Sequence, residues 1–284
     1  MQCRYKGDRR RRHVIKDITI GQYFPGDSVI HRLDPRVKIV LTLLYIAFLF
    51  IIQTAAAYVF ALAVTVFFVI LTKIPLKMYL RGLKPLLFIL IFTAFLNVFY
   101  STGEPLFQFW IFTVTLQGIK NAVFMILRIF MLVISTSMLT YTTSPIVLTG
   151  GLERLLSPLA KIRLPVHEFS MMMTIALRFI PTLLEETDKI MNAQKARGAD
   201  FETGGLIKRA KALAPILIPL FISAFRRADD LATAMECRCY TGSGEGRTHY
   251  VTYSMSASDY AAIGIMILII AVAILLNFVT VMGF

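Results

Sequence analysis

Two short sequences place an arginine between small residues at the predicted end of a long helix. The triplets are Ala196-Arg197-Gly198 and Cys237-Arg238-Cys239. Cations suit helix C-termini and glycine commonly follows one, so each triplet alone could be an ordinary helix end. The duplication favours a second interpretation, in which small neighbours let an exposed guanidinium enter a groove on another protein and bind a carboxylate through two parallel hydrogen bonds. Pattern alone leaves both interpretations open.

Other candidate sites lack the spacing that their chemistry requires. His167 and Glu168 form a His-Glu pair, but a zinc-protease helix needs a second histidine where Met171 stands. The glycine-rich segment 242–248 has neither the glycine spacing nor the lysine of a P-loop. The cysteines of the second triplet have no second cysteine pair with which to form a zinc site. We therefore predict a chain with no catalytic residues, no metal and no cofactor of its own.

The composition is that of an integral membrane protein. Of 284 residues, 57% are hydrophobic and 17% are charged, against about 45–50% and about 25% in soluble domains. Residues 39–72 contain no charged side chain; as one helix they would be roughly 50 Å long, whereas a bilayer core is about 30 Å thick. Two spans fit this stretch better than one. The net charge of +13 indicates cytoplasmic loops rather than a nucleic-acid site.

The positions of charges, prolines and glycines predict about five membrane spans. These lie at about 36–53, 55–72, 85–101, 113–140 and 260–284. Asp34 and Pro35 supply an N-cap and a first-turn proline for the first span. Residues 73–84 carry four cations and no anion, which predicts a cytoplasmic loop, whereas the 101–112 loop has no cation and is predicted to lie outside.

The predicted fold class is an all-α integral membrane protein with a cytoplasmic helical coupling region. Its four regions are a basic cytoplasmic N-terminus with an interfacial segment (1–35), four spans (36–141), cytoplasmic coupling helices (142–257) and a last span (258–284). Two long helices are predicted in the third region, at about 165–197 and 205–239. Each has an apolar face that two helices alone could not bury. The positive-inside rule places the C-terminus outside.

A charge within a span raises an alternative function. Arg128 lies in the fourth predicted span, eight residues after Lys120 and on roughly the same helix face. An arginine in a membrane is costly and often functional, but it could also extend to the cytoplasmic interface. This pair motivates the alternative of a self-sufficient channel or secondary transporter. The sparse polar residues near the membrane midplane and the lack of an evident repeat argue against it.

From Ile18 onward, the sequence resembles the transmembrane T subunit of energy-coupling factor (ECF) transporters. The resemblance rests on the segment GQYFPGDSVIHRLDPR at 21–36, the two X-Arg-X triplets, and AMECRCYTGSGEGRT at 234–248. In this family glycine often follows the second arginine, whereas this chain has Cys239. Cysteine is also small, so we expect the same role for this triplet. We leave open whether its backbone conformation matches that of a glycine.

The resemblance implies a non-catalytic coupling subunit of an importer in the bacterial cell membrane. Such a subunit joins two cytoplasmic ABC-type ATPases, identical or not, to one or more small substrate-binding (S) subunits that capture a vitamin or metal-ion nutrient. ATP and Mg would be bound by the ATPases. Arg197 would dock into one ATPase and Arg238 into the other, each with its small neighbours. The apolar faces of the long helices would hold the S subunit.

Overall fold

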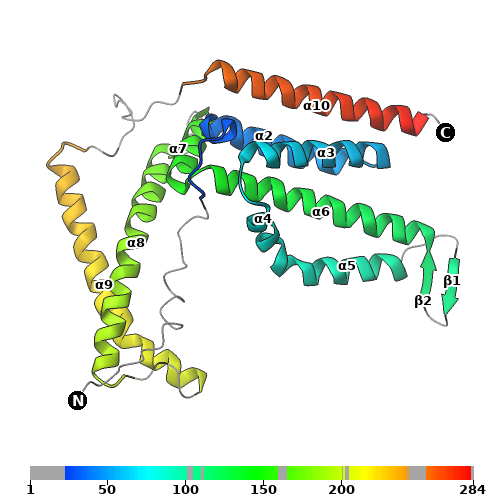
Figure 1. Cartoon of the computed structure of the whole chain (residues 1–284). Coiled ribbons are helices and arrows are strands. Elements are labelled where there is room, and N and C mark those ends of the chain that lie inside the picture. Colours follow the sequence, from blue (N-terminus) through cyan, green and yellow to red (C-terminus); the bar gives the residue numbers. More distant parts are fainter. Residues whose placement is uncertain are drawn as a thin grey trace, which may run out of the picture. The chain divides into compact units, whose positions relative to one another are not determined.

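The structure is a computed structural model that describes most of the chain. The described residues are 23–100, 105–109, 112–158, 165–199, 201, 205–240, 242 and 254–282. They are mainly helical, which confirms the predicted fold class (Figure 1). A two-stranded antiparallel hairpin, β1 (Pro105–Phe109) and β2 (Phe112–Thr115), was not predicted; it occupies part of the predicted outer loop and the first residues of the predicted fourth span. The basic segment 1–22 and most of the glycine-rich segment lie outside the described residues.

The chain divides into two compact units, which we describe separately. The membrane unit comprises residues 21–155 and 251–284, and the arm unit comprises residues 1–20 and 156–250. The arm unit contains α8 (Val166–Ala196) and α9 (Leu206–Glu236), each 31 residues long. These two helices match the two long helices predicted from sequence.

Four helical segments of the described chain are long and apolar enough to cross a membrane. They are α3 (Ala55–Thr72), the segment Leu76–Phe99, α6 (Leu116–Thr142) and Ala257–Val279 of α10 (Ala257–Met282). The helix before them, α2 (Pro35–Ile51), has 17 residues, which is at the short end of the range for a membrane span. The predicted first span at 36–53 is therefore a helix of marginal length, and its crossing of the bilayer stays a prediction.

The predicted cytoplasmic loop at 73–84 is mostly helical, a conformation that the sequence did not predict; its cytoplasmic side stays a prediction. After α3 ends, α4 occupies Leu76–Leu83, and a short 3-10 turn, η1 (Lys84–Leu86), leads into α5 (Leu87–Tyr100). In Figure 1, α4 runs across the direction of α3 and α5 at one end of the membrane unit. The clustered cations predicted the side of the membrane on which this segment lies, and not its conformation.

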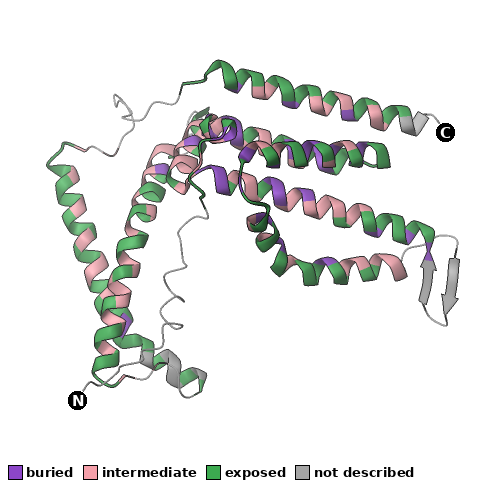
Figure 2. Ribbon diagram, viewed as in Figure 1, coloured by how far each residue is buried: buried purple, intermediate pink, exposed green. Residues whose placement is uncertain are grey.

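Helix α6 is the centre of the membrane unit. It packs against α2, α3, α4 and α5, and α10 packs against α2 and α3. One core cluster lies among α2, α3, α6 and α10 and includes Phe48 and Tyr58, and a second joins α4 to α3 and α6 through Tyr79 and Tyr141. Figure 2 shows the buried residues of these helices in purple, with exposed residues on the outward faces. Such outward apolar faces suit a lipid environment.

A buried lysine holds one end of the membrane unit together. Lys38, on α2, is 6% exposed. Its Nζ atom donates to the backbone oxygens of His31 and Thr142 at 3.0 and 3.1 Å, and to Thr143 Oγ1 at 3.3 Å. These three bonds use the whole donor capacity of an ammonium group. They join the N-terminal segment to the end of α6.

A buried carboxylate makes the matching connection to the last helix. Oδ1 of Asp259, in the first turn of α10, accepts from the backbone N–H of Asp34 at 2.9 Å, and Oδ2 accepts from Ser256 N at 2.8 Å. Asp34 in turn caps α2 by accepting from Arg36 N at 2.9 Å, with Pro35 at the first position. This confirms the predicted helix start. We call Lys38, Asp34 and Asp259 the polar knot.

The segment before α2, which the sequence predicted to be interfacial, is partly helical in the described chain. A four-residue helix, α1 (Val29–Arg32), is capped by Ser28, and the N–H of Phe24 donates to the backbone oxygen of Tyr141 at 2.9 Å. On the other side, α7 (Pro145–Leu156) crosses close to the start of α2. A Cβ atom on Gly151 would lie 2.9 Å from Pro35 Cβ, so only glycine permits this approach.

Substitution of the buried lysine tests the polar knot. Lys38→Met removes the charge and leaves three acceptors and two carboxylates without it, so we expect unfolding to become easier by about 2–4 kcal/mol. The measurement is the apparent Tm of the purified chain in detergent. Lys195→Met, at an exposed lysine of α8, is the control and should leave Tm nearly unchanged. Equal Tm values for the two variants would contradict a stabilising knot.

Candidate functional site

The arm unit is built from two long helices that pack against each other. Where α8 and α9 meet, Arg227 Nη2 donates to Glu186 Oε2 at 2.6 Å. A hydrogen bond with the Ser223 side chain, aided by the positive charges of Arg227 and Lys189, holds the pKa of Glu186 below its ordinary value. The carboxylate is therefore ionised at neutral pH. We call this ion pair the crossing.

Helix α8 ends in a Schellman-type cap that contains the first triplet. Gly198 N–H donates to Lys195 O and Ala199 N–H donates to Gln194 O, both at 3.0 Å. Gly198 has φ +87, in the left-handed region that this cap requires. Arg197 is the residue just before the left-handed turn, at the tip of the helix.

Helix α9 ends in the same geometry. Cys239 N–H donates to Glu236 O at 2.8 Å, and Tyr240 N–H donates to Met235 O at 3.0 Å. Cys239 has φ +58, so it takes the conformation that Gly198 takes in α8. Cysteine at this position therefore gives α9 the same form of cap that glycine gives α8. A left-handed conformation costs a non-glycine residue about 1–2 kcal/mol.

The two arginines thus occupy equivalent positions, and both are open to solvent. All six residues of the two triplets are exposed in the described chain: Ala196, Arg197, Gly198, Cys237, Arg238 and Cys239. The first arginine lies eleven residues after Glu186 and the second lies eleven residues after Arg227. Each tip is therefore about 16 Å along its helix from the crossing.

The structure separates the two arginines rather than bringing them together. In Figure 1, α8 and α9 run in roughly opposite directions through the crossing. Their C-terminal ends therefore lie on opposite sides of it. Two separate exposed cations suit two separate binding grooves better than one shared site.

The described part of the structure gives no support to a metal site at His167 and Glu168. His167 and Glu168 lie in the first turn of α8. Across the part of the chain that the structure describes, no group of three or more His, Cys, Asp or Glu residues could hold a metal ion. Cys237 and Cys239 are free thiols.

Arg128 has local partners inside the membrane unit. Its Nη2 atom donates to the backbone oxygen of Ile52, at the end of α2, at 3.1 Å and also to the Tyr58 hydroxyl. Its guanidinium lies 5.7 Å from the Tyr58 ring centroid and 5.9 Å from that of Phe50. It therefore binds the α2–α3 turn, at the end of the unit opposite to the polar knot. These contacts give it a structural role and offer no support for an ion pathway.

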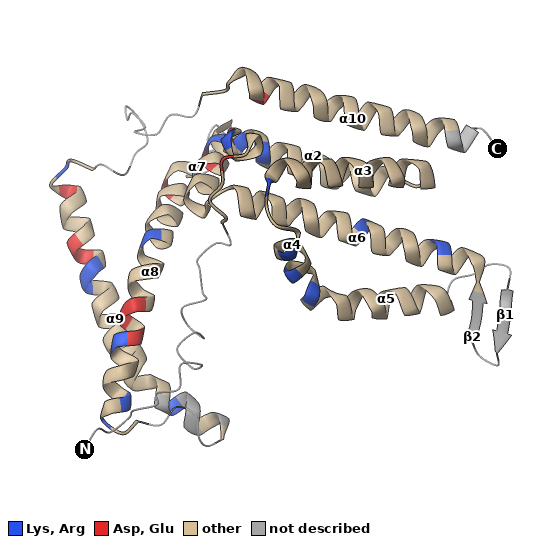
Figure 3. Cartoon of the chain, viewed as in Figure 1, with Lys and Arg blue, Asp and Glu red and all other residues tan. Residues whose placement is uncertain are grey.

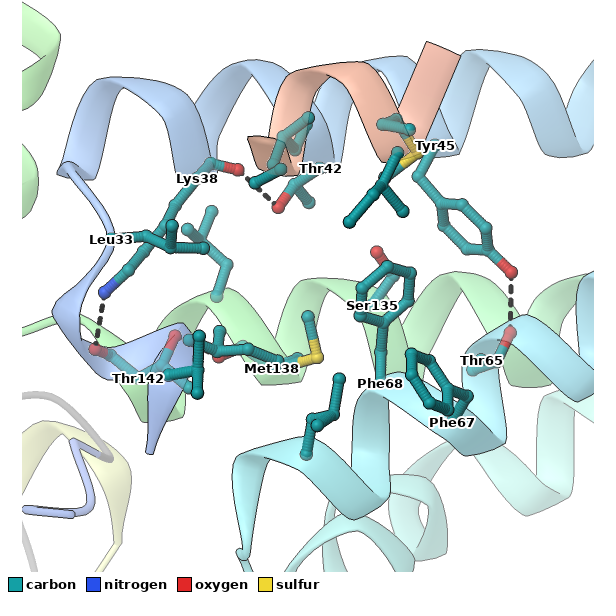
Figure 4. A pocket seen from close by; sticks show the side chains of 18 of the residues that line it. Leu33, Lys38, Thr42, Tyr45, Thr65, Phe67, Phe68, Ser135, Met138 and Thr142 are labelled. Carbon is teal, nitrogen blue, oxygen red and sulfur yellow. Dashed lines mark hydrogen bonds between the residues drawn. The ribbon is translucent and has the colours of Figure 1, made fainter. Parts of the chain in front are cut away.

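A cavity of about 320 Å³ lies among α2, α3, α6 and α10 (Figure 4). Its wall is mostly apolar. Lys38 stands at one end, bonded to Thr142, and Tyr45 bonds Thr65 at 2.6 Å at another part of the wall. Lys38 and Tyr45 thus use their polar atoms in bonds within the chain, as residues that hold helices together do.

The described fold defines a multi-pass membrane protein that carries a pair of long helical arms, each tipped by an exposed arginine. Comparison with known proteins agrees with this class. A family model described as "Cobalt transport protein" (CbiQ) matches residues 26–250. Its span includes both arms.

Curated relatives match over nearly their whole lengths. Proteins named energy-coupling factor transporter transmembrane protein EcfT are 51% identical in Ruminiclostridium cellulolyticum, over 94% of this chain and 99% of the relative, and 53% identical in Clostridium kluyveri, over 92% and 97%. The Bacillus subtilis protein of that name is 44% identical over 93% of this chain and 100% of the relative. This chain belongs to the EcfT family and is the transmembrane component of an ECF transporter.

Substitutions in the two caps should change the stability of the two helix ends in opposite directions. Gly198→Ala should destabilise the end of α8 by about 1 kcal/mol, because alanine is strained at this φ although its Cβ would have no neighbour within 4 Å. Cys239→Gly should stabilise the end of α9 by a similar amount. Hydrogen exchange with mass spectrometry should show faster exchange at Ala199 and slower exchange at Tyr240, each by about fivefold. Changes of the same sign in both variants would contradict this account.

Proposed function

We propose that this chain couples ATP hydrolysis by two cytoplasmic ABC-type ATPases to movement of a membrane substrate-binding subunit that takes up a vitamin or other micronutrient. The observation that carries the proposal is the equivalent placement of two exposed arginines at identically capped, separated helix ends. In this arrangement Arg197 docks into one ATPase and Arg238 into the other. The chain itself is non-catalytic, and ATP and Mg belong to the partners.

The local geometry at each arginine suits docking into a groove. Small residues flank both arginines, so neighbouring side chains do not block the guanidinium groups from entering a groove on a partner. The Schellman-type cap orders the backbone at the tip before binding, which reduces the conformational entropy lost on association. A guanidinium can bind a carboxylate through two parallel hydrogen bonds, which supplies affinity and orientation together.

Helix α9 carries an apolar stripe that suits a membrane partner. Its members recur one helical turn apart and are each about half or more exposed in the described chain: Leu217 49%, Ile218 61%, Phe221 62%, Ile222 58% and Phe225 65%. A stripe of this size is typical of an interaction surface. We infer that it holds the substrate-binding subunit. A tilt of the arms on ATPase closure would then reach that subunit directly.

Charge reversal at the two tips tests the docking proposal. Arg197→Glu and Arg238→Glu each replace an attractive contact with a repulsive one, so each should weaken ATPase binding by at least about thirtyfold. The measurement is the amount of each ATPase that co-purifies with the tagged chain, identified by mass spectrometry. Substrate uptake should fall in parallel, and the double variant should bind neither ATPase.

Matched controls separate docking from net charge. Lys195→Glu lies two residues from the first tip, and Arg226→Glu lies on α9; both positions are exposed and undergo the same change of charge. These variants should retain ATPases and uptake. If the double tip variant retains both ATPases, the docking proposal fails. Transport by the purified chain alone in liposomes would instead establish the self-sufficient transporter.

A separate change tests the stripe. Phe221→Asp puts a charge in the centre of an apolar surface, so the substrate-binding subunit should be lost from the purified complex while both ATPases stay bound. Ala234→Asp, at an exposed position about half a turn around the same helix from the stripe, is the control and should keep all partners. Loss of the ATPases together with the substrate-binding subunit would show a general defect of the arm and would contradict a dedicated surface.

A further inference from the structure

Helix α4 carries a row of positive charges at one end of the membrane unit. Lys77 and Arg81 lie one turn apart on the helix, with Lys73 before it and Lys84 after it, and all four are exposed. Residues 73–100 contain no Asp or Glu. Figure 3 shows positive charges in blue along α4 and next to its ends. The row therefore lacks any acidic neighbour along this segment and complements an anionic surface.

An apolar row lies beside the charged one. Leu76 is 66% exposed and Leu80 is 60% exposed, each one residue before a cation on the helix. The next exposed residues continue onto α5, where Phe88 is 78% exposed. Because the apolar segment Leu76–Phe99 begins with α4 and continues through α5, the leucines and Phe88 belong to one apolar surface suited to acyl chains.

The remaining face of α4 fixes the rotation of the helix. Tyr79 is 2% exposed; its hydroxyl lies 3.1 Å from Thr72 Oγ1, and its ring meets that of Tyr141 edge-on at 5.4 Å. The Tyr141 hydroxyl donates to the backbone oxygen of Met78 at 3.3 Å. The cationic and leucine rows are therefore held outward in a fixed orientation, rather than being the sides of a loose loop.

We propose that α4 is an interfacial helix that binds anionic phospholipid. Leu76 and Leu80 lie among the acyl chains, and Lys77 and Arg81, flanked by Lys73 and Lys84, bind headgroup phosphates. The transverse direction of α4 at the end of the unit (Figure 1) matches a helix in the plane of the interface. Continuity with an apolar span favours lipid over a protein partner. This proposal does not depend on the ATPase docking.

Fluorescence quenching in bilayers tests where α4 lies. Trp110 is the single tryptophan of the chain, so Trp110→Phe gives a background in which Leu80→Trp reports its own surroundings. In phosphatidylcholine vesicles with brominated acyl chains, we expect strong quenching at this position. Ala193→Trp, at an exposed position near the tip of α8, should not be quenched. If the α4 probe is unquenched, the helix faces water or protein and the proposal fails.

The headgroup preference is measured with the same α4 probe. Brominated phosphatidylglycerol mixed into phosphatidylcholine should quench as if enriched about fivefold or more, the effect of a single cation at an anionic surface. Lys77→Gln, Arg81→Gln and Lys84→Gln together should abolish this enrichment and leave quenching by brominated phosphatidylcholine unchanged. The control Lys195→Gln, Lys211→Gln and Arg226→Gln removes the same charge from the arm and should keep the enrichment. Equal enrichment in both triple variants would overturn the proposal.

Discussion

The membrane unit depends on the polar knot, because apolar packing alone cannot fix helices against one another in lipid. Lipid tails are as apolar as leucine side chains, so helix association in a membrane relies on close packing and hydrogen bonds. Lys38 bonds the end of α6, 104 positions later in the sequence, and Asp259 bonds the backbone N–H of Asp34, 225 positions earlier. The second bond connects α10 to the start of α2, although residues 156–250 of the arm unit lie between these helices in the sequence. The last helix is thereby fixed to the same end of the membrane unit as the start of α2.

The arm unit is built differently. Its two long helices pack against each other and expose their C-terminal ends. The Glu186–Arg227 pair is partly exposed, with side-chain exposures of 22% and 39%, and such a pair contributes little on its own. The association of α8 and α9 therefore rests on the packing of the two helices along their contact rather than on this pair alone. At the far end of each helix, the left-handed cap orders the last turn and sets the position of one arginine. The two ordered tips therefore lie at equal distances along their helices from the Glu186–Arg227 pair.

Local sequence signals predicted most of the helices and the two tips, whereas long-range partners could not be predicted. Asp34 and Pro35 form the cap that their order indicates, and the paired triplets lie where helical periodicity ends. Nothing near Lys38 in the sequence identifies its acceptors on α6, since they are more than 100 residues away. The partners of Arg128 could not be predicted either. Its place in the fourth predicted span allowed the side chain to extend to the cytoplasmic interface, but in the structure it bonds the α2–α3 turn. Contacts of this kind depend on packing, which a single sequence does not encode locally.

The geometry of the membrane unit bears on the predicted number of spans. Helix α2 starts at the polar knot and ends at the turn before α3, and α3 returns to α4 at the knot end (Figure 1). Because α2 and α3 run between the same two ends of the membrane unit, their geometry agrees with the prediction of a span at α2. Its 17 residues give about 25 Å of helix, and the capped segment around Asp34 adds length at the knot end. Cations of the described membrane unit gather at that end, with Lys120 and Arg128 on α6 as the exceptions (Figure 3). This asymmetry favours the knot end as the cytoplasmic one.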